Sequence, residues 1–189
     1  ESLHINTWFG GKLVIPRPMV ARIVPAKASN ERLLLAGFGK LSDWSHKSGS
    51  WEHRGNSVKC RNGYLGRDLK LPRRVHVKVQ VEWGGRYPSF SIVTHSSKPS
   101  QYHDDCYNLQ FSSSRIYLYR GRSNRMGQVS LDSSRRGKGK AELDLYVDCD
   151  DKSVALVMDG TLIKKWNNLS YAPSGHSLLL VSQGSYGPT

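Results

Sequence analysis

Apolar and polar residues alternate along several short segments of this chain. In the longest, Val75–Trp83, the residues Val75, Val77, Val79, Val81 and Trp83 are separated by His, Lys, Gln and Glu. Successive side chains of a β-strand point to opposite faces of the sheet, so this period of two predicts a strand with one buried face and one solvent-facing side. No long segment repeats apolar residues at helical spacing. The pattern therefore predicts an all-β protein.

Further short strands are expected downstream, separated by turn-forming residues. We expect hairpins around Ser112–Ser114 and Asp148–Lys152 and a tight turn at Asp159-Gly160. About twelve strands at this spacing suit two antiparallel sheets packed face to face. The alternation assigns ten residues to the core between those sheets: Val75, Val77, Val79, Val81, Leu143, Leu145, Val147, Val154, Leu156 and Met158.

The N-terminal segment differs from the rest of the chain. Gly10-Gly11 separates two strand-like stretches, Leu3–Phe9 and Lys12–Ile15, which predicts a β-hairpin. The polar stretch Pro25–Glu31 is typical of a linker. We therefore expect an N-terminal β-hairpin appendage and linker over residues 1–31, and a β-sandwich over residues 32–189.

Several motifs in the larger part resemble a known superfamily. Ser153–Trp166 is similar to the penultimate hairpin of laminin-G-like, concanavalin A-like jelly rolls, in which a strand ends in Asp-Gly or Asn-Gly before the next strand returns. Leu41–Trp44, Gly49–Trp51 and Leu65–Leu69 match the W…G-x-W…G…L opening of that superfamily. Such modules occur in large envelope-associated proteins of planctomycete- and verrucomicrobia-type bacteria. The resemblance covers roughly residues 33–189 and implies a concanavalin-like jelly-roll sandwich, without implying an established activity.

The charge of the chain is strongly positive, with a formal net value of +13. Eight basic residues and one acidic residue lie between Arg115 and Lys140. Such a segment attracts polyanions, among them acidic polysaccharide and nucleic acid, although a basic loop can also serve only to keep a protein soluble. The residues expected to contact a polyanion are Arg115, Arg120, Arg122, Arg135, Arg136, Lys138 and Lys140.

Aromatic residues suggest a sugar-binding site, because their rings stack on sugar faces while nearby polar groups bind the hydroxyls. Tyr117 and Tyr119 share one face of a predicted strand. A second group lies around the connection that precedes the strand starting near Cys106. Its members are the expected ligand-binding residues, with packing as the alternative role: His95, Tyr102, Asp105 and Tyr107.

Catalysis is not expected. The strand that contains Glu142 and Asp144 is similar to the E-x-D-x-x-E strand of retaining glucanases, but Val147 stands where the acid/base residue is needed. Retaining hydrolysis requires two carboxyl groups about 5 Å apart. Glu142 and Asp144 therefore fit, at most, a degenerate glycoside hydrolase.

No cofactor or metal site is expected. Cys60, Cys106 and Cys149 lie far apart and form no C-x-x-C pair, so the sequence offers no zinc or redox motif. The acidic turn around Asp148–Asp151 fits turn formation better than calcium binding. No apolar run approaches the ~20 residues of a membrane-spanning helix.

The sequence favours a non-catalytic recognition module that binds glycan or protein ligands within a larger extracytoplasmic protein, secreted or in the cell envelope. Two alternatives remain open. The first is a purely structural or interaction domain of an envelope assembly. The second is polyanion binding through the basic segment at residues 115–140.

Overall fold

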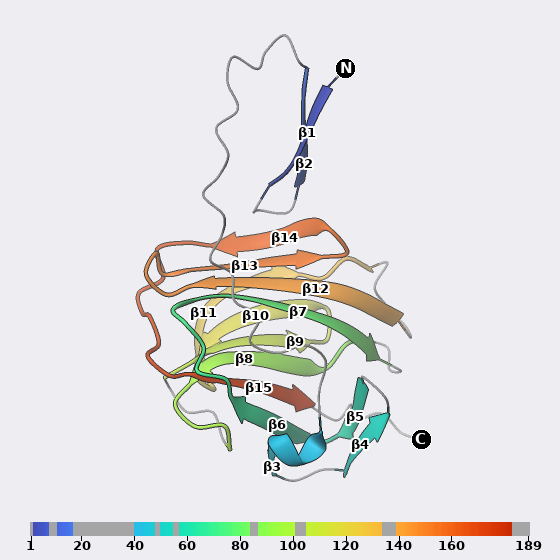
Figure 1. The fold of residues 1–189 in the computed structure, drawn as a ribbon, viewed down its shortest axis with the longest axis vertical. Coiled ribbons are helices and arrows are strands. Elements are labelled where there is room, and N and C mark those ends of the chain that lie inside the picture. Colours follow the sequence, from blue (N-terminus) through green and yellow to red (C-terminus); the bar gives the residue numbers. More distant parts are fainter. Residues whose placement is uncertain are drawn as a thin grey trace.

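The protein forms a β-sandwich of two antiparallel sheets (Figure 1). The structure is a computed structural model that describes residues 2–7, 11–16, 40–47, 50–54, 57–83, 87–100, 105–133 and 139–182. In these ranges the helical content is limited to 3-10 segments, the longest described being η2 (Leu41–Asp43). The described part contains no helix long and apolar enough to cross a membrane. The predicted all-β class with two antiparallel sheets is confirmed.

The larger sheet has seven described strands, and its order along the sheet is β11 (Asn124–Ser130), β10 (Arg115–Arg120), β9 (Tyr107–Ser112), β8 (Phe90–Ser96), β15 (Ser177–Ser182), β6 (Gly63–Asp68) and β3 (Ser45–Lys47). The smaller has four, in the order β14 (Thr161–Trp166), β13 (Ser153–Met158), β12 (Gly139–Asp148) and β7 (Arg74–Trp83). Two further pairs are β1 (Ser2–Thr7) with β2 (Gly11–Pro16), and β4 (Ser50–Arg54) with β5 (Ser57–Arg61).

The main core lies between the two sheets, and the alternating residues of the smaller sheet supply one side of it. The β12 and β13 residues that alternation assigned to the core are all buried, with Leu143 and Leu156 at 0% exposure. Full burial of such a side chain contributes about 1.5–3 kcal/mol. Val75, Val77, Val79 and Val81 also pack against this core, but they are only partly buried. They lie on β7, which is an edge strand of its sheet.

A second, smaller core covers part of the outer face of the larger sheet. Val93, Cys106 and Leu179 pack together at 0% exposure on the side opposite the main core. The chain that follows β8 crosses this face, because the Pro99 carbonyl lies directly over Gly66 on β6, where a Cβ atom would collide with it. The outer face is therefore covered over β6, β15 and β8.

The predicted N-terminal hairpin has the expected pairing, since β1 and β2 run antiparallel from Ser2 opposite Pro16 to Thr7 opposite Gly11. Residues 17–39 lie outside the described ranges. The division of the chain at residue 31 therefore stays a prediction.

Candidate functional site

The carboxylates that suggested a glycosidase lie on the outer face of the smaller sheet, and each is paired with a base. Glu142 Oε1 lies 2.7 Å from Lys78 Nζ, and Asp144 Oδ1 lies 2.7 Å from His76 Nε2. The hydrogen bond with Glu142 raises the pKa of Lys78. These contacts join β12 to β7 across the sheet. The carboxylates thus serve as the acidic side of an interstrand ladder of one ion pair and one hydrogen bond.

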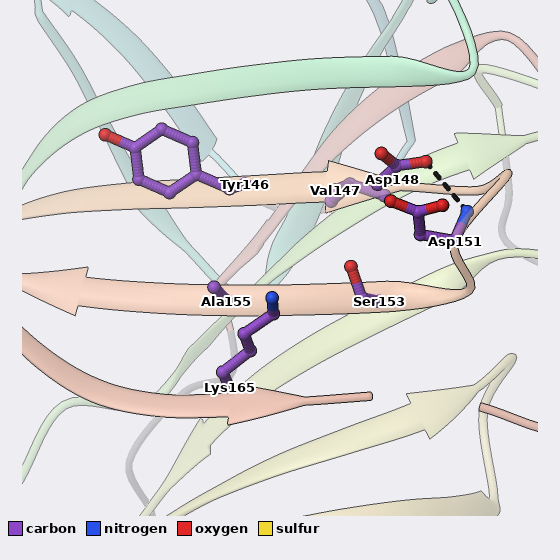
Figure 2. A pocket seen from close by; sticks show the side chains of 7 residues that line it. All are labelled: Tyr146, Val147, Asp148, Asp151, Ser153, Ala155 and Lys165. Atoms are coloured by element: carbon purple, nitrogen blue, oxygen red, sulfur yellow. Dashed lines mark hydrogen bonds between the residues drawn. The ribbon is translucent and has the colours of Figure 1, made fainter. Parts of the chain in front are cut away.

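A shallow hollow lies beside this ladder (Figure 2). Tyr146 forms one side and stacks on His76, with ring centroids 4.2 Å apart. The small side chain of Ala155 leaves the space open, and Ser153 and Lys165 border it. Its volume is about 70 Å³. This volume is well below the ~300–1,000 Å³ of typical ligand pockets, so the hollow is a small surface depression.

Three of the four predicted ligand-binding residues lie at one end of the sandwich, and each makes at least one hydrogen bond within the protein. Tyr107 is only 2% exposed and donates its hydroxyl to the Tyr171 carbonyl at 2.6 Å. Asp105 accepts from the Ser174 hydroxyl at 2.9 Å and from its backbone N–H at 3.3 Å. Tyr102 lies outside the described residues. The Tyr107 ring is therefore a core side chain in this conformation, and the use of this set as a ligand site stays a prediction.

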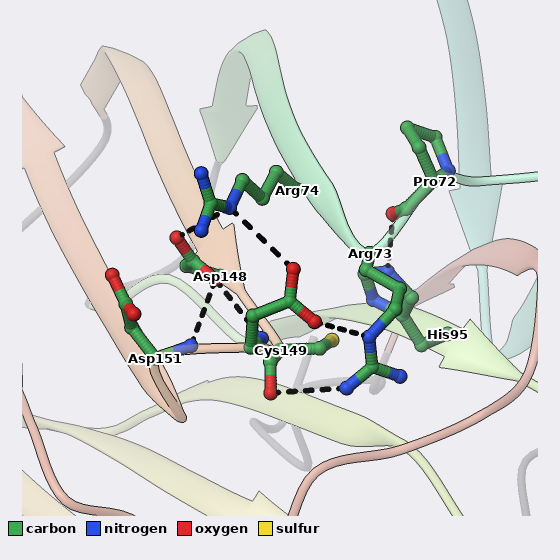
Figure 3. A network of polar contacts seen from close by, with 8 residues as sticks. Pro72, Arg73, Arg74, His95, Asp148, Cys149 and Asp151 are labelled. Atoms are coloured by element: carbon green, nitrogen blue, oxygen red, sulfur yellow. Dashed lines mark hydrogen bonds and ion pairs between the residues drawn. The ribbon is translucent and has the colours of Figure 1, made fainter.

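His95 is also buried, at 2% exposure, in an unusual backbone position. Its φ of 57° places it in the left-handed region, where the pairing of β8 with β15 shifts register between Ser177 and Leu179. Its Nε2 lies 2.9 Å from the Pro72 carbonyl (Figure 3), so Nε2 carries the hydrogen. Burial lowers the pKa of His95, and the bond to Pro72 only partly opposes this effect. His95 is therefore a neutral, inward-facing link between β8 and the segment before β7.

The burial of His95 predicts that acid destabilises the fold. Because folding lowers the pKa of His95, the unfolded chain binds a proton at this residue more readily than the folded protein does. The free energy of unfolding therefore decreases as the pH is lowered below the ordinary histidine pKa of 6.5. We expect His95→Asn, which tolerates a positive φ, to lose less stability than wild type between about pH 7 and 5.5. Urea unfolding at both pH values measures this difference. Identical losses in the two proteins would contradict the assignment.

The acidic turn after β12 forms a network with two arginines (Figure 3). Arg73 binds the carboxylate of Asp150 and donates to the Cys149 carbonyl at 3.2 Å. Arg74 lies 3.0 Å from Asp148, whose other oxygen accepts the backbone N–H groups of Asp150 and Asp151. Among the described residues, no three His, Cys, Asp or Glu side chains are placed to hold a metal ion. The turn is held by arginine and by its own backbone.

The described residues of the predicted polyanion-binding set are spread over different parts of the fold. Arg115 and Arg122 are exposed, while Arg120 is half-buried with its guanidinium 3.9 Å from the centre of the Tyr171 ring. Lys140 lies on β12 of the other sheet, opposite Glu82. The other three members, Arg135, Arg136 and Lys138, lie outside the described ranges. The set does not form one surface across its described members.

The strongest candidate site is the outer face of β9, β10 and β11, beside the covered part of the larger sheet. Tyr117 and Tyr119 lie side by side on β10, with ring centroids 5.7 Å apart and planes inclined by 35°. Both residues are partly exposed. We call this surface the tyrosine platform and define it by six residues: Gln110, Arg115, Tyr117, Tyr119, Arg125 and Gln128.

Strand register places polar side chains on both sides of each ring. Tyr117 lies opposite Gln110 on β9 and opposite Gln128 on β11. Tyr119 lies opposite Arg125, whose guanidinium donates to Gln128 Oε1 at 3.3 Å. The platform thus combines two adjacent rings with amide and guanidinium groups, the mixture that stacks on sugars and binds their hydroxyls.

The sequence indicated Tyr117 and Tyr119 as neighbours but missed the residues that surround them. Gln110 could have been placed by alternation, since Tyr107, Leu109 and Phe111 form the inward side of β9. The position of Arg125 was hidden, because a register shift between Leu118 and Tyr119 brings it opposite the second ring.

The chain matches no family model and no curated protein. Among solved structures it is similar to the carbohydrate-binding module CBM66 from Bacillus subtilis, with a TM-score of 0.50 and 11% identity over 74% of this chain and 88% of that one. The Emp47p carbohydrate recognition domain has a TM-score of 0.47 and 9% identity over 76% of this chain and 81% of that one. Galectin LEC-6 from Caenorhabditis elegans has a TM-score of 0.31 and 12% identity over 59% of this chain and 89% of that one. At such identities, the similarity to CBM66 shows the fold alone, a sandwich of the concanavalin-like, jelly-roll type.

Proposed function

We propose that this chain is a non-catalytic recognition domain that binds glycan through the tyrosine platform. The observation that carries the proposal is the pair of partly exposed tyrosines on one strand, Tyr117 and Tyr119, whose ring centroids lie 5.7 Å apart. Because β10 is paired on both sides, the backbone positions from which the two rings project are fixed before a ligand arrives. Such preorganisation reduces the entropy lost on binding.

The surroundings of the rings support a polar, ring-shaped ligand. Gln110 and Gln128 place side-chain amides on either side of Tyr117. A purely structural interface would instead favour a continuous apolar surface. Among the described large apolar residues the exposed one is Leu162, which lies on β14 of the other sheet.

The proposal excludes hydrolysis. Glu142 and Asp144 are each paired with a base from β7. The platform itself contains no carboxylate. The domain would hold a glycan for a larger extracytoplasmic protein, and the motif resemblance favours a bacterial envelope protein.

The test compares alanine variants of the platform tyrosines with a tyrosine on the other sheet. A glycan array selects the ligand, and calorimetry then measures its dissociation constant. We expect Tyr117→Ala and Tyr119→Ala each to raise the dissociation constant at least about tenfold, because each variant loses a ring that stacks on the sugar. A tenfold change corresponds to about 1.4 kcal/mol of binding free energy. Tyr146→Ala, the control, should bind as wild type does. Unchanged affinity in both platform variants would refute the proposal.

A further inference from the structure

The three strands that carry the platform contain no acidic residue. From Tyr107 to Ser130 the chain has four arginines and no aspartate or glutamate. The nearest acidic residues along the chain, Asp105 and Asp132, precede β9 and follow β11. The local charge of this meander is therefore +4, and a ligand at the platform meets a positive potential.

Two of these arginines belong to the platform itself. Arg115 lies two residues before Tyr117 on the same strand, and thus on the same face of the sheet. Arg125 lies opposite Tyr119 on β11. Each ring consequently has a guanidinium beside it, and both arginines are exposed.

These two arginines differ from the basic residues of β7. There, His76, Lys78 and Arg74 are each paired with a carboxylate of β12. Within the described ranges, no carboxylate lies within ion-pair distance of Arg115 or Arg125; the contact found for Arg125 is with the neutral amide of Gln128. Their charges are therefore not neutralised by the described part of the fold.

We infer that the ligand of the platform is a carboxylated glycan, one built from uronic acid sugars. This inference rests on the proposed function. A guanidinium presents two parallel N–H groups that match the two oxygens of a carboxylate, and charge-assisted bonds of this kind are stronger than neutral ones. Tyr117 and Tyr119 would contact the sugar rings, and Arg115 and Arg125 the acid groups. Sugar stacking and charge recognition then occur on adjacent positions of β10 and β11.

The experiment uses a matched pair of probes, a galacturonic acid tetramer and its methyl ester, which differ in charge but share the sugar. Calorimetry of the whole chain at low salt should give at least tenfold tighter binding of the acid. Arg115→Gln with Arg125→Gln should remove the preference for the acid, so that this double variant binds the acid no more tightly than it binds the ester. Salt should weaken binding of the acid only, because screening acts on the charge term. Lys140→Gln, on the other sheet, is the matched control and should bind as wild type does.

Equal binding of acid and ester by the wild type would overturn the inference and leave the proposed function intact. Failure of both probes, together with an empty glycan array, would overturn both. Equally tight binding of dextran sulfate would overturn the carboxylate assignment in favour of any anionic group. A further outcome is that single-stranded DNA binds, that Arg115→Gln with Arg125→Gln abolishes this binding, and that Tyr117→Ala leaves it unchanged. That result would overturn the inference of a glycan ligand and identify the surface as a general polyanion site.

Discussion

Replacing Leu156 by aspartate is expected to unfold the domain at room temperature. Leu156 is 0% exposed at the centre of the main core, on β13 between β12 and β14. A carboxylate in that position has no described base within the apolar core to pair with, and burying it costs several kcal/mol, which is comparable with the ~5–15 kcal/mol stability of a typical domain. The near-ultraviolet circular dichroism spectrum and the cooperative thermal transition should both disappear.

Leu162→Asp is the control for this result. Leu162 lies on the adjacent strand β14 and is 42% exposed, so aspartate there stays in contact with water. The change in the free energy of unfolding should be within about 0.5 kcal/mol. Comparable losses in the two variants would mean that the assignment of the inner and outer faces is wrong.

Gly66→Ala should be strongly destabilising although it adds a single methyl group. A Cβ at Gly66 would collide with the Pro99 carbonyl, which is backbone and has no rotamer to change, and would lie 2.9 Å from Leu179. The segment over β6 would have to lift, and the second core of Val93, Cys106 and Leu179 would open to water. We expect a loss of about 2–4 kcal/mol, measured by urea unfolding.

Gly160→Ala provides the comparison, because no atom lies within 4 Å of its added Cβ. Gly160 has a φ of 76°, so alanine there suffers backbone strain of about 1 kcal/mol but no collision. Labelling of Cys106 by a thiol reagent, located by peptide mapping, should increase in Gly66→Ala and not in Gly160→Ala. Equal stability and equal labelling in the two variants would contradict the position of Pro99 over Gly66 on β6.

The fold could be predicted from the sequence wherever one face of a strand is buried and the other is exposed to solvent. The alternation of β7 and β12 is of this kind, and the residues it assigned to the core pack there. In β8, by contrast, residues 91–96 are all buried. The main core lies on one side of that strand, and the chain that follows β8 lies on the other. Its sequence therefore carries no period of two from which a buried face could be assigned.

The candidate site was less predictable, for reasons that particular residues make clear. Tyr107 was grouped with a loop, although its alternation with Leu109 and Phe111 indicates the core. His95 occupies a left-handed position where β8 and β15 shift register, which no local pattern reveals. The proximity of Arg125 to Tyr119 likewise depends on a register shift between strands. Such pairings follow from the packing of the whole sheet.

The tyrosine platform consists of outward side chains on strands whose inward side chains form the core. On β10, Ile116 and Leu118 are fully buried, whereas Tyr117 between them is partly exposed. Because outer positions contribute little to stability, substitutions there are tolerated much more readily than substitutions in the core. The same scaffold could therefore acquire a different glycan specificity through changes at a few alternate positions, without passing through an unfolded ancestor. In such a protein, ligand preference is free to diverge far faster than architecture.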